Sequence, residues 1–246
     1  MTEPLEGQVA IVTGGAGFIG RAITQSLAKR GARVVTVDLL DAEVEHAVRM
    51  LVCDVTDSAS VDQVVARAQK EHDRLDILVN CAGGGARTGL VDLDDETWFF
   101  ELNKNLTGAF FFMRAALPHL LKSQFGSIVN VSSISGIIGG LPAQGPEGRS
   151  GPAYAAAKAG LIGLTKWAAR EYGDQGLRVN ASAPGPVLTS AVMHGYDYGT
   201  ASYPIPRMGT PEDMAETVAF LCSPVSGYIT GEVIKVAGGV GMCTRQ

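Results

Sequence analysis

A tyrosine and a lysine stand four residues apart in the segment Tyr154-Ala155-Ala156-Ala157-Lys158. If this segment is helical, the two side chains lie one turn apart on the same face. A tyrosine hydroxyl has an unperturbed pKa of about 10, and a nearby ammonium lowers that pKa because it favours the phenolate. Such a pair can exchange a proton with an alcohol or ketone oxygen while a hydride moves at the adjoining carbon. The same spacing is also common on solvated helices, so the rest of the chain must support this interpretation.

The segment Thr13 to Gly20 has the composition of a phosphate-binding turn. It follows a β-branched run, Val9 to Val12, and leads into a helical pattern that starts at Phe18. Four of its residues are glycines, and three of them, Gly14, Gly17 and Gly20, recur at every third position. Glycines let the backbone approach a pyrophosphate, and a helix N-terminus offers it unpaired N–H groups and the positive end of a dipole. The order of strand, turn and helix favours dinucleotide binding over a turn that only packs a strand on a helix.

Asp38 ends the second β-branched run, eighteen residues beyond Gly20. A carboxylate at this place can accept hydrogen bonds from ribose hydroxyls and repels a 2′-phosphate. The residues that follow, Leu39 and Leu40, supply no cation for such a phosphate. The sequence therefore predicts NAD as the cofactor rather than NADP, with a solvated turn acid as the alternative for Asp38 alone.

Elements of two kinds alternate along the chain and must position these residues. Short strands are expected at Val9 to Val12, Arg33 to Val37, Met50 to Cys53, Ile77 to Val79, Ser127 to Val131, Arg178 to Ala181 and Glu232 to Val236. Helices are expected at Phe18 to Arg30, Ser60 to His72, Thr97 to Leu121, Ala153 to Tyr172 and Pro211 to Leu221. This alternation predicts an α/β fold with a doubly wound parallel sheet (a Rossmann fold), as a single domain over residues 1–246. Two irregular stretches, 139–152 and 186–209, are expected to be substrate loops.

Composition narrows the classes of partner. The chain has 246 residues, 46% of them hydrophobic, which is enough to bury a large core. A net charge of -5 gives no basic surface for a nucleic acid or an anionic membrane. The N-terminus lacks the pattern of a signal peptide, so a cytoplasmic location is expected. The cysteines and histidines are scattered without the spacing of metal ligands, so no metal is expected and the cysteines are expected to be reduced.

Together, these motifs resemble the short-chain dehydrogenase/reductase family along nearly the whole chain. They occur in the family's order: the glycine turn, Asp54-Val55, Asn80-Cys81-Ala82-Gly83, Asn105, Ser132-Ser133, Tyr154 with Lys158, and Pro184-Gly185 followed by Thr189. Many relatives carry asparagine where this chain has Cys81.

The resemblance implies a role for each matching residue. The catalytic set would be Asn105, Ser133, Tyr154 and Lys158. In that set, Ser133 would bind the substrate oxygen, Lys158 would also bind the nicotinamide ribose, and Asn105 would hold a water that links Lys158 to solvent. Ser132 is the adjacent alternative to Ser133, but alternation along the strand end sends the two side chains in opposite directions. Asn105 taken alone could instead be a helix-capping or turn-forming side chain. The cofactor would contact Gly14, Gly17, Phe18, Ile19, Gly20, Asp38, Leu39, Asp54, Val55, Asn80, Ala82, Gly83, Tyr154, Lys158, Pro184, Gly185, Val187 and Thr189.

Three places depart from the family's pattern. Phe18 stands where a second glycine is usual, a spacing that resembles the sugar-nucleotide branch of the superfamily. The interval from Ser133 to Tyr154 is long, and its surplus lies in residues 141–152, where Gln144 or Arg149 is expected either to contact a polar or anionic substrate or to be a solvated loop residue. The third departure is Ala237, where relatives commonly carry an acid before two glycines.

The expected function is an NAD-dependent oxidoreductase that acts on a secondary alcohol or ketone, with Tyr154 as the general acid/base. A 3-oxoacyl thioester reductase is the alternative, although the usual NADP preference of such enzymes conflicts with Asp38. A sugar-nucleotide epimerase and a non-catalytic NAD-binding scaffold are minor alternatives. The aromatic-rich loop 193–203 is expected to cover an apolar or cyclic substrate or to form a lid. The resemblance further implies a homotetramer, or a dimer, with Phe110, Phe111 and Phe112 in the core or in an interface.

Overall fold

Seven short runs rich in valine, isoleucine and alanine pair in parallel to form one sheet. The computed structural model describes residues 4–85, 88–140, 150–189 and 199–242. Its strands are β1 (Val9–Thr13), β2 (Arg33–Asp38), β3 (Ala47–Val52), β4 (Ile77–Asn80), β5 (Ser127–Val131), β6 (Arg178–Pro184) and β7 (Val233–Val236). Their order across the sheet is β3-β2-β1-β4-β5-β6-β7. The predicted doubly wound parallel sheet is therefore confirmed.

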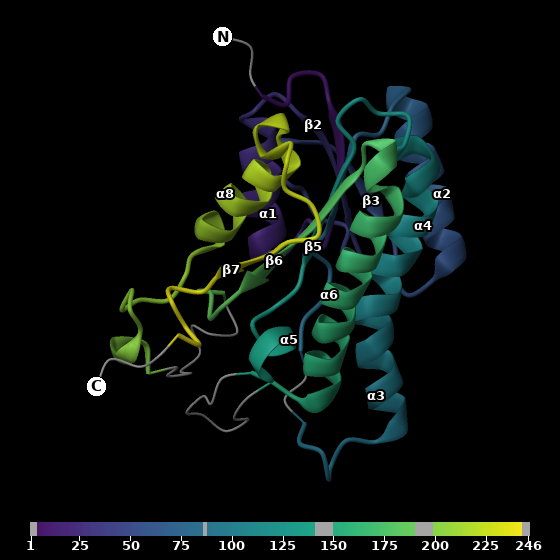
Figure 1. Cartoon of the computed structure of the whole chain (residues 1–246). Helices are drawn as coiled ribbons and strands as arrows, with labels where there is room; N and C mark the ends of the chain where they lie inside the picture. The colour runs from purple at the N-terminus through teal and green to yellow at the C-terminus, as the bar shows by residue number, and fades with distance from the viewer. Residues whose placement is uncertain (1–3, 86–87, 141–149, 190–198, 243–246) are drawn as a thin grey trace.

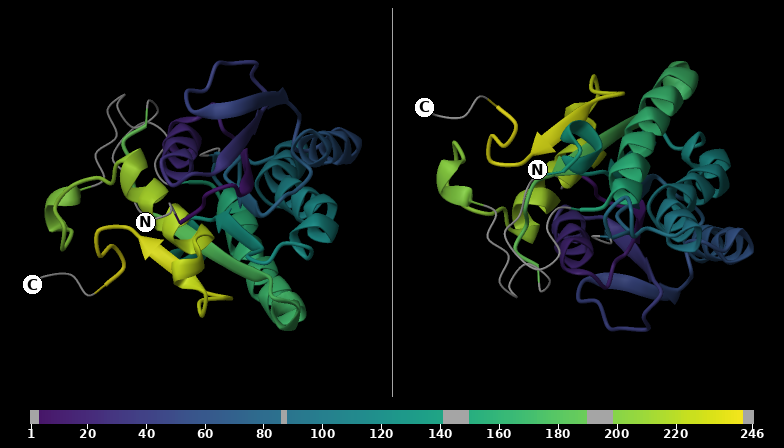
Figure 2. Two further views of the ribbon diagram at one scale, coloured as in Figure 1. Left: turned by 90° about the horizontal axis from the view of Figure 1, so that it is seen from above. Right: turned by 90° about the horizontal axis from the view of Figure 1, so that it is seen from below.

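Helices cover both faces of the sheet (Figure 1). They are α1 (Phe18–Ala28), α2 (Ser58–His72), α3 (Asp95–Leu102), α4 (Gly108–Leu120), α5 (Ser135–Ile138), α6 (Pro152–Tyr172) and α8 (Pro211–Cys222). The shorter helical turns are η1 (Asn103–Thr107), η2 (Gly173–Gln175), η3 (Thr200–Ser202) and η4 (Pro224–Ser226). Helices α1 and α8 lie on one side of the sheet, and α2, α4 and α6 lie on the other, as both views of Figure 2 show.

Alternation along the central strands builds a separate core under each helical layer. In β1, the side chains of Val9 and Ile11 join the core beneath α2, α4 and α6, whereas those of Ala10 and Val12 join the core beneath α1 and α8. All of these side chains are fully buried. Burial on both faces explains why this strand is apolar throughout instead of alternating between apolar and polar residues.

The predicted strands and helices are confirmed, although their ends shift. Two differences from the prediction concern helices: one predicted helix is divided, and one short helix was not predicted. Strand β6 continues to Pro184, beyond the predicted end at Ala181. The single helix expected at Thr97 to Leu121 is α3 and α4 joined by η1, a π-turn. A π-turn adds one residue to a helical turn, which hydrophobic periodicity does not reveal. The short helix α5 was not predicted.

The three consecutive phenylalanines of α4, predicted to lie in the core or in an interface, differ in burial. Phe112 is fully buried and Phe111 packs against the core from its edge, whereas Phe110 is 42% exposed.

Cys53, Cys81 and Cys222 are free thiols, and Cys243 lies outside the described residues. Within the described ranges, none of the helices is both long and apolar enough to cross a membrane.

The sheet contains the point at which a doubly wound fold binds its ligand. The chain runs outward from β1 to β2 and β3 on one side, and from β4 to β5, β6 and β7 on the other. The connections after β1 and β4 therefore diverge, and a crevice opens beyond the carboxyl ends of these strands. Ligands of this fold bind in that crevice.

Candidate active site

A cleft of about 640 Å³ opens beyond the carboxyl ends of the strands. This volume lies within the usual range of small-molecule sites. Its walls come from the segments that follow β1, β2, β3, β4, β5 and β6, together with the start of α6. Predicted residues that line it are Gly14, Gly17, Phe18, Ile19, Gly20, Asp38, Leu39, Asp54, Val55, Ala82, Gly83, Ser133, Tyr154, Lys158, Pro184, Gly185, Val187 and Thr189.

The glycine turn has no room for side chains at several of its glycines, Gly14 and Gly20 among them. Gly14 has a φ of +67°, and a Cβ there would lie 2.8 Å from the Cα of Ala82. A Cβ on Gly20 would overlap the carbonyl oxygen of Gly14. Gly17 precedes α1, and no side chain within the described ranges caps that helix. The backbone N–H groups at the start of α1 therefore face a cradle without side chains, which fits a pyrophosphate.

Asp38 is fixed by the backbone on both sides of its carboxylate. Oδ2 accepts a hydrogen bond from the N–H of Ala16 at 3.0 Å, and Oδ1 accepts one from the N–H of Leu40 at 3.2 Å. The carboxylate therefore stands directly beside the glycine turn. Leu39 is 66% exposed, which leaves an apolar side chain where a phosphate-binding cation would be needed.

Asn80, for which a cofactor contact is predicted, has a side chain that bonds within the scaffold. Its side chain is buried and does not line the cleft. Its Nδ2 donates to Oδ1 of Asn130 at 2.8 Å, and Asn130 in turn donates to the hydroxyl of Thr165 at 2.9 Å. Because this chain of bonds joins β4, β5 and α6, the Asn80 side chain belongs to the scaffold, while a contact of Asn80 with the cofactor stays a prediction.

Tyr154 and Lys158 lie on the first two turns of α6, as the spacing predicts. Pro152 at the first helical position starts that helix with its φ already suited to it. The Nζ of Lys158 lies 5.6 Å from the centre of the Tyr154 ring and donates to the carbonyl oxygen of Val131 at 2.9 Å. Burial lowers the pKa of Lys158 to about 8. The ammonium is therefore still the main form near neutral pH and can favour the phenolate of Tyr154.

The two serines after β5 use their hydroxyls differently. The hydroxyl of Ser132 donates to the carbonyl oxygen of Lys158 at 2.9 Å, which ties the strand end to α6. The Oγ of Ser133 accepts a hydrogen bond from the N–H of Ser135 at 3.1 Å, so its own hydrogen can be donated to a substrate oxygen. This difference favours Ser133 as the residue that binds substrate.

Asn105 lies in the π-turn η1 behind the cleft and is buried. Its Oδ1 accepts from the N–H of Gly84 at 3.0 Å, and its Nδ2 donates to the carbonyl oxygen of Gly84 at 3.1 Å. The same Nδ2 also donates to the carbonyl oxygen and to a carboxylate oxygen of Glu101. Asn105 thus joins α3 to the segment after β4, while its predicted link to Lys158 through water stays a prediction.

Sequence reasoning missed three residues of this region: Gly85, Glu101 and Lys104. A Cβ on Gly85 would lie 2.8 Å from Cγ of Tyr154, so the tyrosine ring rests on a glycine. Glu101 is buried and pairs with Lys104, which lines the cleft. The spacing of Glu101, three residues before Lys104 and four before Asn105, is the signal that could have found this pair. Gln144, Arg149 and most of the loop 193–203 lie outside the described residues.

Comparisons with known proteins agree with this geometry. Residues 14–241 match the family model described as enoyl-(acyl carrier protein) reductase. The 3-oxoacyl-acyl-carrier-protein reductase FabG of Thermotoga maritima is 38% identical over 250 residues, covering 96% of this chain and 98% of that protein. The 2-(S)-hydroxypropyl-CoM dehydrogenase 3 of Xanthobacter autotrophicus is 34% identical, covering 98% and 99%. A crystal structure from Burkholderia xenovorans, described as a short-chain dehydrogenase/reductase, superposes with a TM-score of 0.87 at 36% identity, covering 98% and 99%.

Proposed function

Because the chain belongs to the short-chain dehydrogenase/reductase family, whose members are nicotinamide-dependent oxidoreductases, we propose that it reduces the ketone of a 3-oxoacyl thioester to a 3-hydroxyacyl thioester. This is the activity named for its FabG relatives. The sequence alone predicts a secondary alcohol dehydrogenase or ketone reductase, with the thioester reductase as the alternative. The named activities of the relatives favour the thioester reductase.

One observation carries the proposal: Ser133, Tyr154 and Lys158 line the same cleft as the glycine turn. Tyr154 donates its hydroxyl proton to the ketone oxygen as the carbonyl carbon accepts a hydride, so that one ketone becomes one alcohol. Ser133 donates a hydrogen bond to the same oxygen and stabilises its developing negative charge. The Lys158 ammonium stabilises the phenolate that remains on Tyr154.

The cradle also fits a nicotinamide dinucleotide, which supplies the hydride when bound. Gly14, Gly17 and Gly20 would hold its pyrophosphate at the start of α1, and Asp54 with Val55 would hold its adenine. Asp38 would accept hydrogen bonds from the adenosine ribose, and we propose NADH as the preferred form on that basis. Pro184, Gly185, Val187 and Thr189 would lie along the nicotinamide end of the cleft.

A second candidate is an NAD-dependent dehydrogenase of a small secondary alcohol. Two observations favour it: the carboxylate of Asp38 beside the glycine turn, and the 34% identity to the hydroxypropyl-CoM dehydrogenase. Both candidates use the same proton donor and differ in what fills the remainder of the cleft.

Initial rates separate the two candidates. Purified protein is assayed with acetoacetyl-pantetheine thioester and with unactivated methyl ketones, each with NADH and with NADPH. We expect a higher kcat/KM for the thioester than for the simple ketones. A higher kcat/KM for simple ketones, and for their alcohols in the reverse direction, would replace the proposal with the second candidate.

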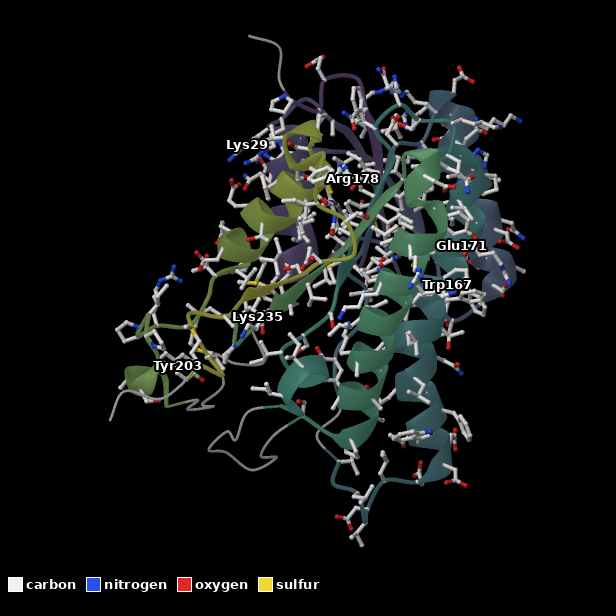
Figure 3. All side chains as sticks on the ribbon, viewed as in Figure 1. Lys29, Trp167, Glu171, Arg178, Tyr203 and Lys235 are labelled. Atoms are coloured by element: carbon white, nitrogen blue, oxygen red, sulfur yellow. The ribbon has the colours of Figure 1, made fainter. Side chains whose placement is uncertain are left out.

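We further propose that the protein assembles as a homotetramer through α4 and α6. Large apolar side chains stand exposed on these helices, with Phe110 42% and Trp167 57% accessible. Figure 3 shows Trp167 and Glu171 on the solvent-facing side of α6. Sedimentation equilibrium tests the assembly, and a monomer at micromolar concentration would contradict it.

A further inference from the structure

An ion pair with a buried carboxylate, Glu101 with Lys104, lies beside Asn105. Glu101, near the end of α3, has a side chain that is 4% exposed, and its Oε1 accepts from the Nζ of Lys104 at 2.7 Å. The side chain of Lys104 is 27% exposed and lines the cleft, with its Nζ 5.0 Å from the centre of the Phe100 ring. Desolvation of the Glu101 carboxylate costs free energy, so this ion pair is by itself weak evidence of a stabilising role.

The second carboxylate oxygen of Glu101 connects this pair to Asn105. The Nδ2 of Asn105 donates to Oε2 of Glu101 at 3.1 Å, while Oδ1 of the same amide accepts from the N–H of Gly84. A carboxylate can only accept hydrogen bonds, so Oε2 of Glu101 holds the nitrogen end of the Asn105 amide toward α3, together with the carbonyl oxygens of Glu101 and Gly84 that accept from the same Nδ2. Glu101 therefore contributes to the orientation of Asn105 and, through Asn105, to the placement of the segment after β4.

The same cluster reaches Lys158 through Gly83. A Cβ on Gly83 would lie 2.5 Å from Oδ1 of Asn105 and 3.3 Å from Nζ of Lys158, so both side chains face this glycine. The titratable groups around Lys158 are Cys81 after β4, Glu101 and Lys104 from α3 and η1, and Tyr154 on its own helix. Burial has the largest effect on the pKa of Lys158; of the smaller effects, Cys81 raises this pKa, Lys104 lowers it and Glu101 raises it.

We propose that Glu101 is a positioning residue which, with Lys104 as its counter-charge, orients Asn105 and sets the electrostatic balance beside Lys158 and Tyr154. The inference deepens the proposed function, since it concerns the proton donor of that reaction. Glu101 acts through its neighbours and is not assigned a contact with substrate. The charges of Glu101 and Lys104 act on Lys158 with opposite sign.

The sign of each perturbation follows from charge. Ionisation of Tyr154 creates a negative charge, and deprotonation of Lys158 removes a positive one, so a nearby anion opposes both steps. Removing the anion with Glu101→Gln makes both steps easier and moves the titration of the coupled pair to lower pH. Removing the cation with Lys104→Met moves it to higher pH. Each shift is on the order of one pH unit for charges separated by several ångströms in a partly buried site.

Tyrosinate absorbance tests this without turnover. The cofactor-free protein is titrated with base, and the curve of the same protein carrying Tyr154→Phe is subtracted to isolate Tyr154. We expect the midpoint of Glu101→Gln to fall, that of Lys104→Met to rise, and that of the double variant to return toward wild type. Glu71→Gln, which removes an exposed carboxylate paired with Arg67 on α2, is the matched control and is expected to leave the midpoint unchanged.

The pH dependence of kcat/KM for the reduction is the second readout and is expected to shift in the same directions. Midpoints that stay at the wild-type value in both single variants, or that move in the same direction, overturn the inference even if the variants lose activity. If Glu101→Gln does not fold, Lys104→Met and Glu101→Asp test the inference in its place. Lys104→Met is expected to raise the midpoint, and Glu101→Asp, which retains the charge, is expected to keep the wild-type midpoint. Failure of the proposed function would show as absent turnover with the absorbance shifts intact.

Discussion

Replacing Asp38 by asparagine is expected to remove the protein's preference between NADH and NADPH. The Asp38 carboxylate is fixed beside the glycine turn by the N–H groups of Ala16 and Leu40. A 2′-phosphate on the adenosine ribose would bring nearly two negative charges to within about 4 Å of it. At the dielectric constant of water, the repulsion is about 2 kcal/mol, which corresponds to roughly a 30-fold preference for NADH.

The measurement is the ratio of kcat/KM for NADH to that for NADPH, at saturating thioester and at two salt concentrations. Asp38→Asn is expected to bring the ratio to within a few-fold of one, and Asp38→Asn with Leu39→Arg to reverse it, because arginine binds phosphate in a bidentate manner. Salt is expected to reduce the preference in wild type and to have less effect in Asp38→Asn.

The ratio is the informative quantity because Asp38→Asn also loses a backbone partner. An amide can accept from only one of the two N–H groups, and leaving the other unpaired costs about 1–3 kcal/mol of turn stability. That cost affects both cofactors alike and is measured separately by urea unfolding. A wild-type preference for NADPH, or a ratio that Asp38→Asn leaves unchanged, would refute the role given to this carboxylate.

Three further substitutions test the site and the scaffold. Gly85→Ala places a Cβ against the Tyr154 ring and is expected to lower kcat by roughly 10-fold or more in a folded protein; an unchanged kcat would contradict the contact. Asp76 is buried, and although burial raises the pKa of its carboxyl, hydrogen bonds led by that from Arg74 hold this pKa below its ordinary value. The stabilisation that the Asp76 carboxylate provides is therefore present above about pH 4 and is lost as pH falls. Asp76→Asn is expected to lower the free energy of unfolding, measured in urea, by about 3 kcal/mol at neutral pH and by less near pH 3. An equal loss at both pH values would contradict this. Phe112→Ala empties a fully buried position and is expected to lower the free energy of unfolding by about 3–5 kcal/mol, and a cost below about 1 kcal/mol would contradict its place in the core.

The parts of the site that the sequence predicts are those built from consecutive residues. The glycine turn lies between β1 and α1 as its pattern requires, and Tyr154 and Lys158 share a face of α6 because helical geometry fixes their spacing. Asp38 ends β2 beside that turn because neighbouring parallel strands finish at the same edge of the sheet.

The parts that the sequence did not predict depend on contacts between distant segments. The inward side chain of Asn80 follows from its partner on β5, fifty residues away. The π-turn that carries Asn105 adds one residue to a single helical turn, a feature too short for hydrophobic periodicity to locate. In the sequence, Glu101 has no feature that separates it from other acidic residues on helices. Its role depends on its contact with Asn105, which in turn contacts the glycines after β4. The substrate assignment changed for a similar reason, since it rests on whole-chain similarity to the FabG relatives rather than on any single motif.

Single-turnover reduction of acetoacetyl-pantetheine thioester by NADH, compared between wild type and Tyr154→Phe, tests the proton donor most directly. Cofactor affinity is measured in parallel by fluorescence so that loss of binding is separated from loss of chemistry. The expected result is a hydride-transfer rate lowered by about 10²–10⁴-fold in Tyr154→Phe with nearly unchanged cofactor affinity. A variant that retains the wild-type rate would contradict the role of Tyr154 as the acid of the reaction.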